Sequence, residues 1–213
     1  YGDSPTGTLY GLAQYVDVFG NDRLKLVSDS FPGTWGTWTS PSFDGTMVGF
    51  SASFRFSFKN ENGGPGDGFS FIWGDLSDAS DERISGGEFG IFGFLEDGSG
   101  LSVGISSYTE GGDSGIDGRW GTERFVNTPM SFESVTYTDY KTAARPESMP
   151  SLRIDWRYDT GVTVWIAFPS GDPQLVYANA GISELAGIDP RDWSFGFAGR
   201  NGGIDQDVLI GDL

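Results

Sequence analysis

The chain contains no cysteine and no histidine. It therefore cannot form a disulfide, a cysteine nucleophile, a serine–histidine triad or a histidine-ligated zinc site. Lysine is also scarce, and occurs only as Lys25, Lys59 and Lys141. No stretch approaches the roughly 18 apolar residues of a membrane span, and the residues from Tyr1 to Gly7 are polar and turn-like rather than a signal peptide. We expect a mature or excised soluble domain without membrane insertion.

Acidic residues dominate the charge. The net charge is −17 at pH 7, from 21 Asp and 9 Glu against 13 Lys and Arg. Such a chain repels phosphate backbones and anionic lipids, so nucleic acid and membrane surfaces are poor partners. Two explanations of the acidity stay open. One is a solvated acidic surface suited to a saline or calcium-rich exterior, and the other is a set of loop Asp residues that ligate Ca²⁺.

Short alternating segments predict an all-β chain. Glycine accounts for 34 of 213 residues and aromatic residues for 15%, a composition that favours short strands joined by turns. A hairpin is predicted where two alternating runs flank Asp159-Thr160-Gly161, with Gly161 in a left-handed conformation. One short helix is expected at Ser183 to Ala186. The predicted strands are Phe50–Phe58, Gly68–Trp73, a half-buried strand through Leu101, Val103 and Ile105, Leu152–Tyr158, Val162–Phe168, Trp193–Phe197 and Asp207–Leu213.

Neither an internal repeat nor a linker interrupts this pattern. About ten short strands with hardly any helix pack most naturally as two facing sheets. We therefore predict a single domain over residues 1–213, an antiparallel two-sheet jelly-roll β-sandwich.

Four segments support a more specific resemblance through their order and spacing. They are the strand, turn and strand of Phe54–Phe58 with Gly63–Phe71, the glycine-rich loop Ser85–Phe92, the strand Gly100–Tyr108, and the stretch from Ile182 through Trp193 to Gly202. Together they resemble the concanavalin A-like lectin/glucanase superfamily, meaning L-type lectins and the LamG-like jelly rolls of bacterial surface proteins. The resemblance implies the concanavalin A-like sandwich and a sugar site built from loops.

The resemblance also implies individual site residues. Asp67 would accept hydrogen bonds from sugar hydroxyls, while the backbone N–H of Gly87 would donate one. Tyr108 could stack on a sugar face. Arg200 and Asn201 occupy the terminal loop, where relatives tune specificity. The alternative is that Asp67 merely closes a turn, and that Arg200 and Asn201 do the same.

A metal site is less clearly implied. Relatives place acidic residues on the third segment to hold a metal that orders the sugar loop, but the matching positions here are Gly104 and Ser106. Downstream, Glu110, Asp113 and Asp117 could supply the hard oxygen ligands that Ca²⁺ prefers. The same residues could equally lie in a solvated loop.

The tryptophans divide into two predicted groups. Trp35, Trp38 and Trp120 stand in glycine-rich surroundings and are predicted at the surface, where they could stack on sugars. In contrast, Trp73, Trp156 and Trp193 lie in phase with alternating apolar residues and are predicted in the core.

The leading functional hypothesis is a non-catalytic, lectin-like carbohydrate-binding or adhesin domain. It would belong to a secreted or cell-surface protein of bacterial type, with an extracellular glycan and other domains of a larger surface protein as partners. A structural or protein-contact spacer domain is the alternative, favoured by Gly104 and Ser106. A glycoside hydrolase is disfavoured, because the paired carboxylates that such enzymes need are absent in the usual Glu-x-Asp-x-x-Glu spacing.

Overall fold

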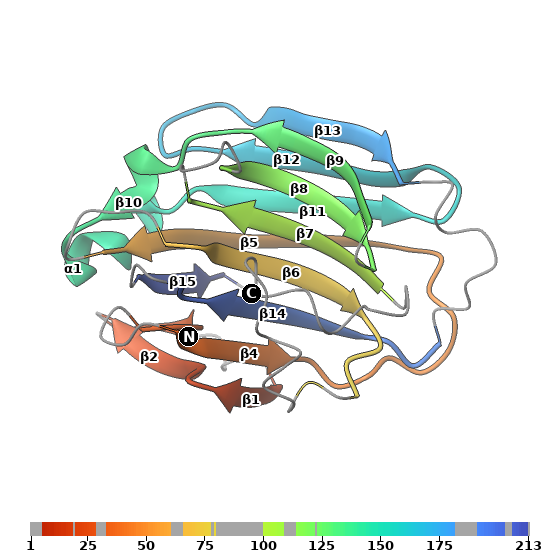
Figure 1. The fold of residues 1–213 in the computed structure, drawn as a ribbon, viewed down its shortest axis with the longest axis horizontal. Helices are drawn as coiled ribbons and strands as arrows, with labels where there is room; N and C mark the ends of the chain where they lie inside the picture. The colour runs from red at the N-terminus through yellow and green to blue at the C-terminus, as the bar shows by residue number, and fades with distance from the viewer. Residues whose placement is uncertain are drawn as a thin grey trace.

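The computed structural model describes residues 6–18, 20–28, 33–60, 66–77, 79, 100–108, 114–121, 123–181, 191–202 and 206–212. These residues form two sheets packed face to face, and Figure 1 looks onto the sheet that we call the front sheet. Neighbouring strands are antiparallel except for the short parallel pair of β10 with β5. The predicted all-β, two-sheet jelly-roll sandwich is confirmed.

The front sheet has seven strands. In spatial order they are β1 (Thr8–Gly11), β4 (Trp35–Thr39), β14 (Ser194–Arg200), β6 (Gly68–Gly74), β7 (Gly100–Ser106), β8 (Gly115–Trp120) and β9 (Glu123–Pro129).

The second, or back, sheet has eight strands. In spatial order they are β13 (Gln174–Ala180), β12 (Gly161–Ala167), β11 (Ser151–Arg157), β5 (Gly49–Lys59), β15 (Asp207–Gly211), β3 (Asn21–Lys25) and β2 (Gln14–Val18), with β10 (Thr136–Tyr137) paired to β5. Short helical segments accompany them: α1 (Tyr140–Ala143) and two 3₁₀ turns, Glu133–Val135 and Pro146–Ser148.

Aromatic side chains fill the space between the sheets. In β5 the alternating Phe54, Phe56 and Phe58 are each at most 2% exposed, as the period of two predicts. The ring of Phe54 meets Phe197 of the front sheet edge-on at 4.8 Å. Such pairs contribute beyond the area that they bury, so they fix how the two sheets face one another.

The predicted 152–168 hairpin is also confirmed. Its two strands, β11 and β12, pair from Ser151 with Ala167 to Arg157 with Gly161. Gly161 has φ of +79°, a left-handed conformation in which a Cβ atom would be strained.

Three sequence predictions need correction or lie outside the structure. Trp38 and Trp120, expected at the surface, are only 6% and 7% exposed and belong to the core. Both point between the sheets, because their neighbouring glycines lie within packed strands rather than in open loops. The strand β7, expected to be half-buried, is buried on both faces. The predicted helix at 183–186 lies outside the described residues.

A small second core covers part of the outer face of the back sheet and consists of Val18, Ala143, Ala144, Met149 and Leu209. The helix α1 begins after Asp139, whose carboxylate accepts hydrogen bonds from the backbone N–H of Lys141 and Thr142. The carbonyl of Ala143, in its last turn, accepts a 2.6 Å hydrogen bond from the buried Ser57 hydroxyl. The sequence offered only four residues of helical pattern here, too few to predict a helix.

Replacing Phe56 with alanine tests the aromatic layer. The ring is fully buried and lies within 6 Å of three other phenylalanine rings. We expect Phe56→Ala to lower the free energy of unfolding by about 3–5 kcal/mol, measured by chemical denaturation. Phe43 is 43% exposed and serves as the control; Phe43→Ala should cost less than about 1 kcal/mol. Equal losses would contradict this account of the core.

Candidate functional site

The ends of four neighbouring front-sheet strands lie in one row. Arg200 at the end of β14 pairs with Gly68 at the start of β6, and Gly68 pairs with Ser106 at the end of β7. Ser106 in turn pairs with Gly115, where β8 begins. The segments that lead into or out of these strands therefore leave the sheet along the same edge. We call the described part of this region, residues 66–67, 107–108, 200–202 and 206, the loop junction.

Asp67 and Gly202 are in direct contact in the loop junction. A Cβ atom added to Gly202 would lie 2.8 Å from both carboxylate oxygens of Asp67, so only glycine permits this approach. The Asp67 side chain is half-buried. A planar carboxylate is thus held against backbone at the edge of the sheet, partly open to solvent.

A buried side chain connects the segments of the loop junction. The Oε1 atom of Gln206 accepts hydrogen bonds from the Gly66 N–H at 2.8 Å and from the Ser107 hydroxyl at 3.1 Å. The same hydroxyl lies 2.9 Å from the Gly66 carbonyl. Gln206 is 0% exposed, and its backbone N–H donates to Asn201 Oδ1 at 3.2 Å. One glutamine therefore joins segments that are far apart in the sequence.

Of the predicted sugar-site residues, Asp67, Tyr108, Arg200 and Asn201 come together in the loop junction, and Gly87 lies outside the described residues. Tyr108 and Arg200 are half-buried. Asn201 is fully buried, and its amide also donates to the Ser28 carbonyl at 2.7 Å. Both ends of this amide are thus engaged within the protein, which favours the turn interpretation for Asn201. Contact of these residues with a sugar stays a prediction.

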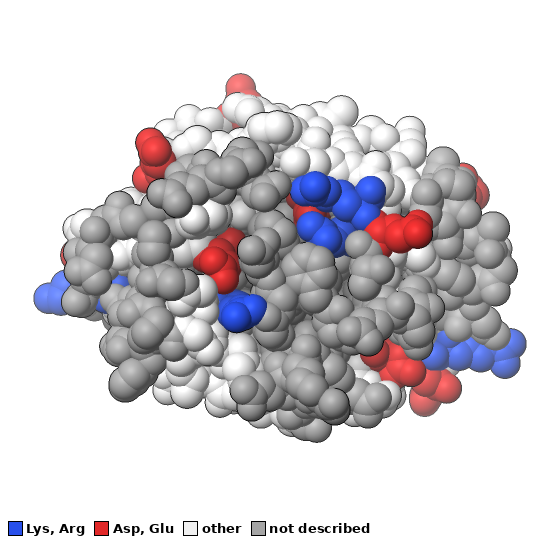
Figure 2. Space-filling view, in the orientation of Figure 1, with Lys and Arg blue, Asp and Glu red and all other residues white. Residues whose placement is uncertain are grey.

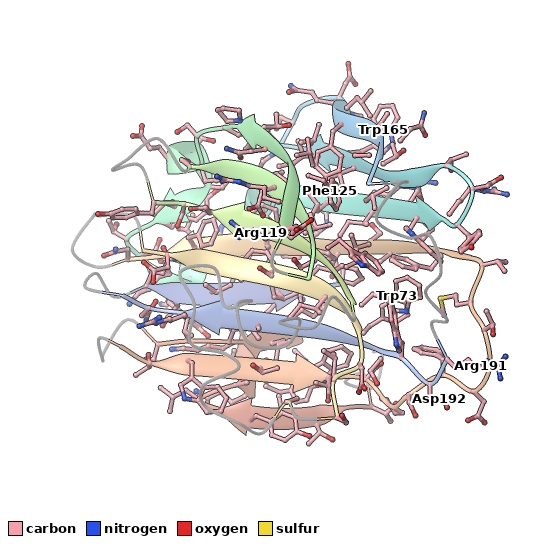
Figure 3. All side chains as sticks on the ribbon, turned by 45° about the vertical axis from the view of Figure 1, so that its right-hand side comes forward. Trp73, Arg119, Phe125, Trp165, Arg191 and Asp192 are labelled. Carbon is pink, nitrogen blue, oxygen red and sulfur yellow. The ribbon has the colours of Figure 1, made fainter. Side chains whose placement is uncertain are left out.

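A buried ion pair lies on β8 of the front sheet. The Nε of Arg119 donates to Asp117 Oδ2 at 2.8 Å, and each side chain is 8% exposed. Arg124 of β9 lies opposite Arg119. Figure 2 shows Lys/Arg side chains gathered with Asp/Glu side chains over β8 and β9, and Figure 3 shows Arg119 and Phe125 on these neighbouring strands.

Burial raises the pKa of the Asp117 carboxyl above its ordinary value, against the opposing attraction of Arg119 and Arg124. The charge of Asp117 is also felt at Tyr177, whose pKa burial raises well above its usual value and Asp117 raises further. For the Asp117 carboxylate, the cost of losing water on burial therefore exceeds the attraction of the arginines.

Known proteins resemble this chain in structure but not in sequence. No protein-family model matches it, and no curated protein matches its sequence. The seed lectin of Lotus tetragonolobus superposes with a TM-score of 0.71 at 16% identity, covering 99% of this chain and 91% of the lectin. The chain has the L-type lectin fold.

Two further lectin-fold structures carry sugars. The Bauhinia forficata lectin in complex with GalNAc gives a TM-score of 0.68 at 16% identity, covering 96% of this chain and 89% of the lectin. The exoplasmic/lumenal domain of VIP36, in its Ca²⁺/Man3GlcNAc-bound form, gives 0.62 at 13% identity, covering 97% of this chain and 84% of that domain.

The described residues of this lectin fold do not fit a Ca²⁺ ion. On β7 the outward positions Gly104 and Ser106 offer no carboxylate. Asp117 lies directly opposite Gly104, within β8 rather than in the loop where it was expected. Its carboxylate already binds the Arg119 guanidinium, and a cation beside two arginines would be repelled. No group of three or more Asp or Glu residues able to hold a metal occurs in the described ranges.

Glu110 and Asp113, the other two predicted calcium ligands, lie outside the described residues. Calcium binding by Glu110, Asp113 and Asp117 therefore stays a prediction. Because Asp117 is paired with Arg119, Glu110 and Asp113 would have to be the main ligands.

Three residues of interest escaped the sequence analysis. Ser107 directly follows the buried strand β7, and Gln206 directly precedes the buried strand β15. An uncharged polar residue next to a buried strand was the only sequence pattern that could have indicated them. Trp165 lies between the core residues Val164 and Ile166 and is half-buried on the outer face of the back sheet (Figure 3). Its position out of phase with the alternating apolar residues could have predicted that exposure.

Removing Arg119 should make the stability depend more strongly on pH. The folded pKa of Asp117 is raised, so ionisation of its carboxyl costs stability as the pH rises through that pKa. Arg119→Met should raise the pKa further, because the carboxylate then loses its ion-pair partner and keeps only the weaker attraction of Arg124. We expect a loss of about 3–5 kcal/mol at pH 7 and a clearly smaller one at pH 4, measured by urea denaturation.

The matched control is Arg153→Met, which breaks the exposed Arg153–Asp155 pair, where the arginine is 60% exposed. It should cost at most about 1 kcal/mol. An Arg119→Met loss that is the same at pH 4 and pH 7 would show that the charge of Asp117 does not set the stability of this face.

Proposed function

We propose that residues 1–213 form one non-catalytic carbohydrate-binding domain of a secreted or cell-surface protein. The observation that carries the proposal is the Asp67 carboxylate held against Gly202 at the loop edge of the front sheet. Two neighbouring hydroxyls of a sugar offer two donors to one planar acceptor. A half-buried carboxylate whose position is already fixed loses little entropy when it accepts them.

The rest of the loop junction suits such a ligand. Tyr108 and Arg200 are half-buried on either side of the Asp67 segment. An aromatic ring can cover the apolar C–H face of a sugar, and a guanidinium can donate to its oxygens. Gly87 would add a backbone donor. The lectin fold and the sugar-bound neighbours support this assignment.

The cellular setting is part of the proposal. The VIP36 neighbour is an exoplasmic/lumenal domain, and the net charge of −17 disfavours nucleic acid and anionic membranes as partners. In the described part of the chain, no helix is long and apolar enough to cross a membrane. We propose an extracellular glycan or polysaccharide as the ligand, and attachment to other domains of a bacterial surface protein.

The front sheet argues against glycoside hydrolysis. Its seven strands carry two carboxylates, Asp117 and Glu123. Asp117 is buried in its pair with Arg119, while Glu123 begins the edge strand β9 and is exposed. A glycosidase needs two carboxyl groups facing one cleft, about 5.5 Å apart in retaining enzymes. Glu123 and Asp117 do not provide such a pair.

A spacer or protein-contact domain is the second candidate. Gly104 and Ser106 favour it, because a jelly roll that kept its sandwich and lost its ligand would lose polar ligand residues first. Glycan arrays separate the two proposals. A well-folded protein that binds nothing across varied glycans, with and without Ca²⁺, would leave the spacer role.

Replacing Asp67 tests sugar recognition directly. We expect Asp67→Ala to weaken binding of an array-selected glycan about 10- to 100-fold, because hydrogen bonds to a charged acceptor are lost. Gly202→Ala should weaken binding as well, since its methyl group would displace the carboxylate. Isothermal titration calorimetry gives the affinities.

Asp75→Ala is the matched control for Asp67→Ala. It removes an exposed aspartate at the other end of β6, whose carboxylate accepts a hydrogen bond from the Ser77 N–H at 3.1 Å. Its affinity should equal that of the unaltered protein. If Asp67→Ala binds as tightly as Asp75→Ala, the proposed site is wrong even where the protein proves to bind glycans.

Catalysis has its own test. Purified protein incubated with β-glucans should release no reducing sugar above the level of a heat-denatured sample. Release that disappears in Asp117→Asn or Glu123→Gln would replace the binding proposal with a hydrolase.

A further inference from the structure

Gln206 occupies a position that controls the geometry of the loop junction. Its Oε1 atom reaches the Gly66 N–H and the Ser107 hydroxyl, and its own N–H reaches Asn201. Gly66 is the residue before Asp67, and Asn201 is the residue before Gly202. Each partner of the Asp67–Gly202 contact is therefore fixed one residue away by the same buried glutamine.

The connection extends into the rest of the sandwich. Asn201 donates from its side chain to the Ser28 carbonyl and from its backbone N–H to the Thr34 carbonyl, at 2.7 Å and 2.9 Å. Gln206 directly precedes β15, whose Val208, Leu209 and Ile210 are fully buried. The loop junction is thus anchored to a rigid strand on one side and to the segment before β4 on the other.

The two ends of the Gln206 amide differ in their surroundings. Its Nε2 atom is buried and has no hydrogen-bond partner among the residues that the structure describes. A buried amide that leaves a donor unsatisfied costs stability, and an apolar side chain of similar shape would avoid that cost. The described hydrogen bonds of the Gln206 side chain are thus all made by its acceptor, Oε1.

We propose that Gln206 orders the loop junction in place of a divalent cation, so that the loop junction forms without Ca²⁺. The neighbour VIP36 has a Ca²⁺/glycan-bound form, but here the matching face of β7 lacks carboxylates and Asp117 is bound to Arg119. The neutral cross-link from Gln206 to Gly66, Ser107 and Asn201 holds the loop junction from the protein's own chain. The inference rests on the proposed function only for its effect on glycan affinity.

The first experiment compares the ligand-free protein in excess EDTA and in millimolar Ca²⁺. We expect the same melting temperature within about 1 °C, and the same hydrogen-exchange protection of the Gly66 and Gln206 amides. A Ca²⁺-dependent rise in melting temperature, or protection at Gly66 that disappears in EDTA, would overturn the proposal and point to the segment containing Glu110 and Asp113.

The second experiment removes the acceptor. Gln206→Ala should abolish the protection of the Gly66 amide while the amides of β11 and β12 stay protected. If that variant does not fold, Ser107→Ala is used, which removes one arm of the cross-link. The matched control is Ser57→Ala, a buried serine whose single hydrogen bond holds α1; it should leave Gly66 protected. If Gln206→Ala folds and Gly66 stays protected, or if it does not fold and Ser107→Ala leaves the protection of Gly66 unchanged, the proposal is overturned.

A conservative variant separates positioning from packing. Gln206→Glu keeps the size and the acceptor, and burial raises the pKa of the new carboxyl. Below that pKa the side chain is neutral and resembles glutamine. We expect its melting temperature to match that of the unaltered protein at pH 4.5 and to fall behind it by at least about 4 °C at pH 8. A melting temperature at pH 4.5 that already lies well below that of the unaltered protein would show that a side chain of the same size with an acceptor oxygen is not sufficient, and would contradict the positioning role.

These readouts need no glycan, so failure of the proposed function leaves them interpretable. If glycans bind and Asp67→Ala abolishes binding, Gln206→Ala should weaken the same glycan at least tenfold, with or without Ca²⁺. If the protein binds no glycan but shows the expected hydrogen-exchange pattern, the proposed carbohydrate-binding function is wrong, while the proposed role of Gln206 in ordering the loop junction is supported.

Discussion

A layer of aromatic rings between two sheets is the constraint on which the other features depend. Trp73 lies 4.2 Å from Trp156 and 4.7 Å from Trp193, ring centre to ring centre, so it joins the front sheet to the back sheet and to the start of β14. Bulky rings allow few alternative packings. Because these rings fix the register of β6 and β14, they also fix the row of strand ends from Arg200 to Gly115. The loop junction is therefore a consequence of the core.

Much of the sandwich could be predicted from residue alternation. Phe54, Phe56 and Phe58 follow a period of two, and that period is sufficient to assign a face to every residue of β5. The glycine-rich surroundings of Trp38 and Trp120 led to the opposite and wrong assignment. Glycine marks both exposed turns and places where two backbones approach closely inside a sheet, and composition alone does not distinguish them. The described residues alone form fifteen strands, more than expected, because edge strands such as β1 and β9 carry mixed polar residues that alternate poorly.

The candidate site was only partly predictable. Asp67, Tyr108, Arg200 and Asn201 were named from their place in a resemblance, and the structure brings them together. The cross-link through Gln206 was not predicted, because it joins residues 140 positions apart. A local sequence pattern does not indicate which distant segment a buried acceptor will contact. Asp117 was assigned to a loop, but its alternation with Ile116 and Trp120 places it on a strand. There its partner is Arg119, two residues away on the same face, where an alternating acid and base could have indicated an ion pair.

The row of strand ends from Arg200 to Gly115 is the boundary between the residues that determine the fold and the residues available to contact a ligand. Arg200, Gly68, Ser106 and Gly115 are held in place by sheet pairing over the aromatic core, whereas the described residues beyond them, 66–67, 107–108, 201–202 and 206, are not part of that core. Insertions or exchanges in those segments would change what the edge of the front sheet contacts and leave the sandwich unaltered. Relatives with the same core can therefore diverge in ligand much faster than in fold, and overall similarity between two such chains is a poor guide to what each one binds.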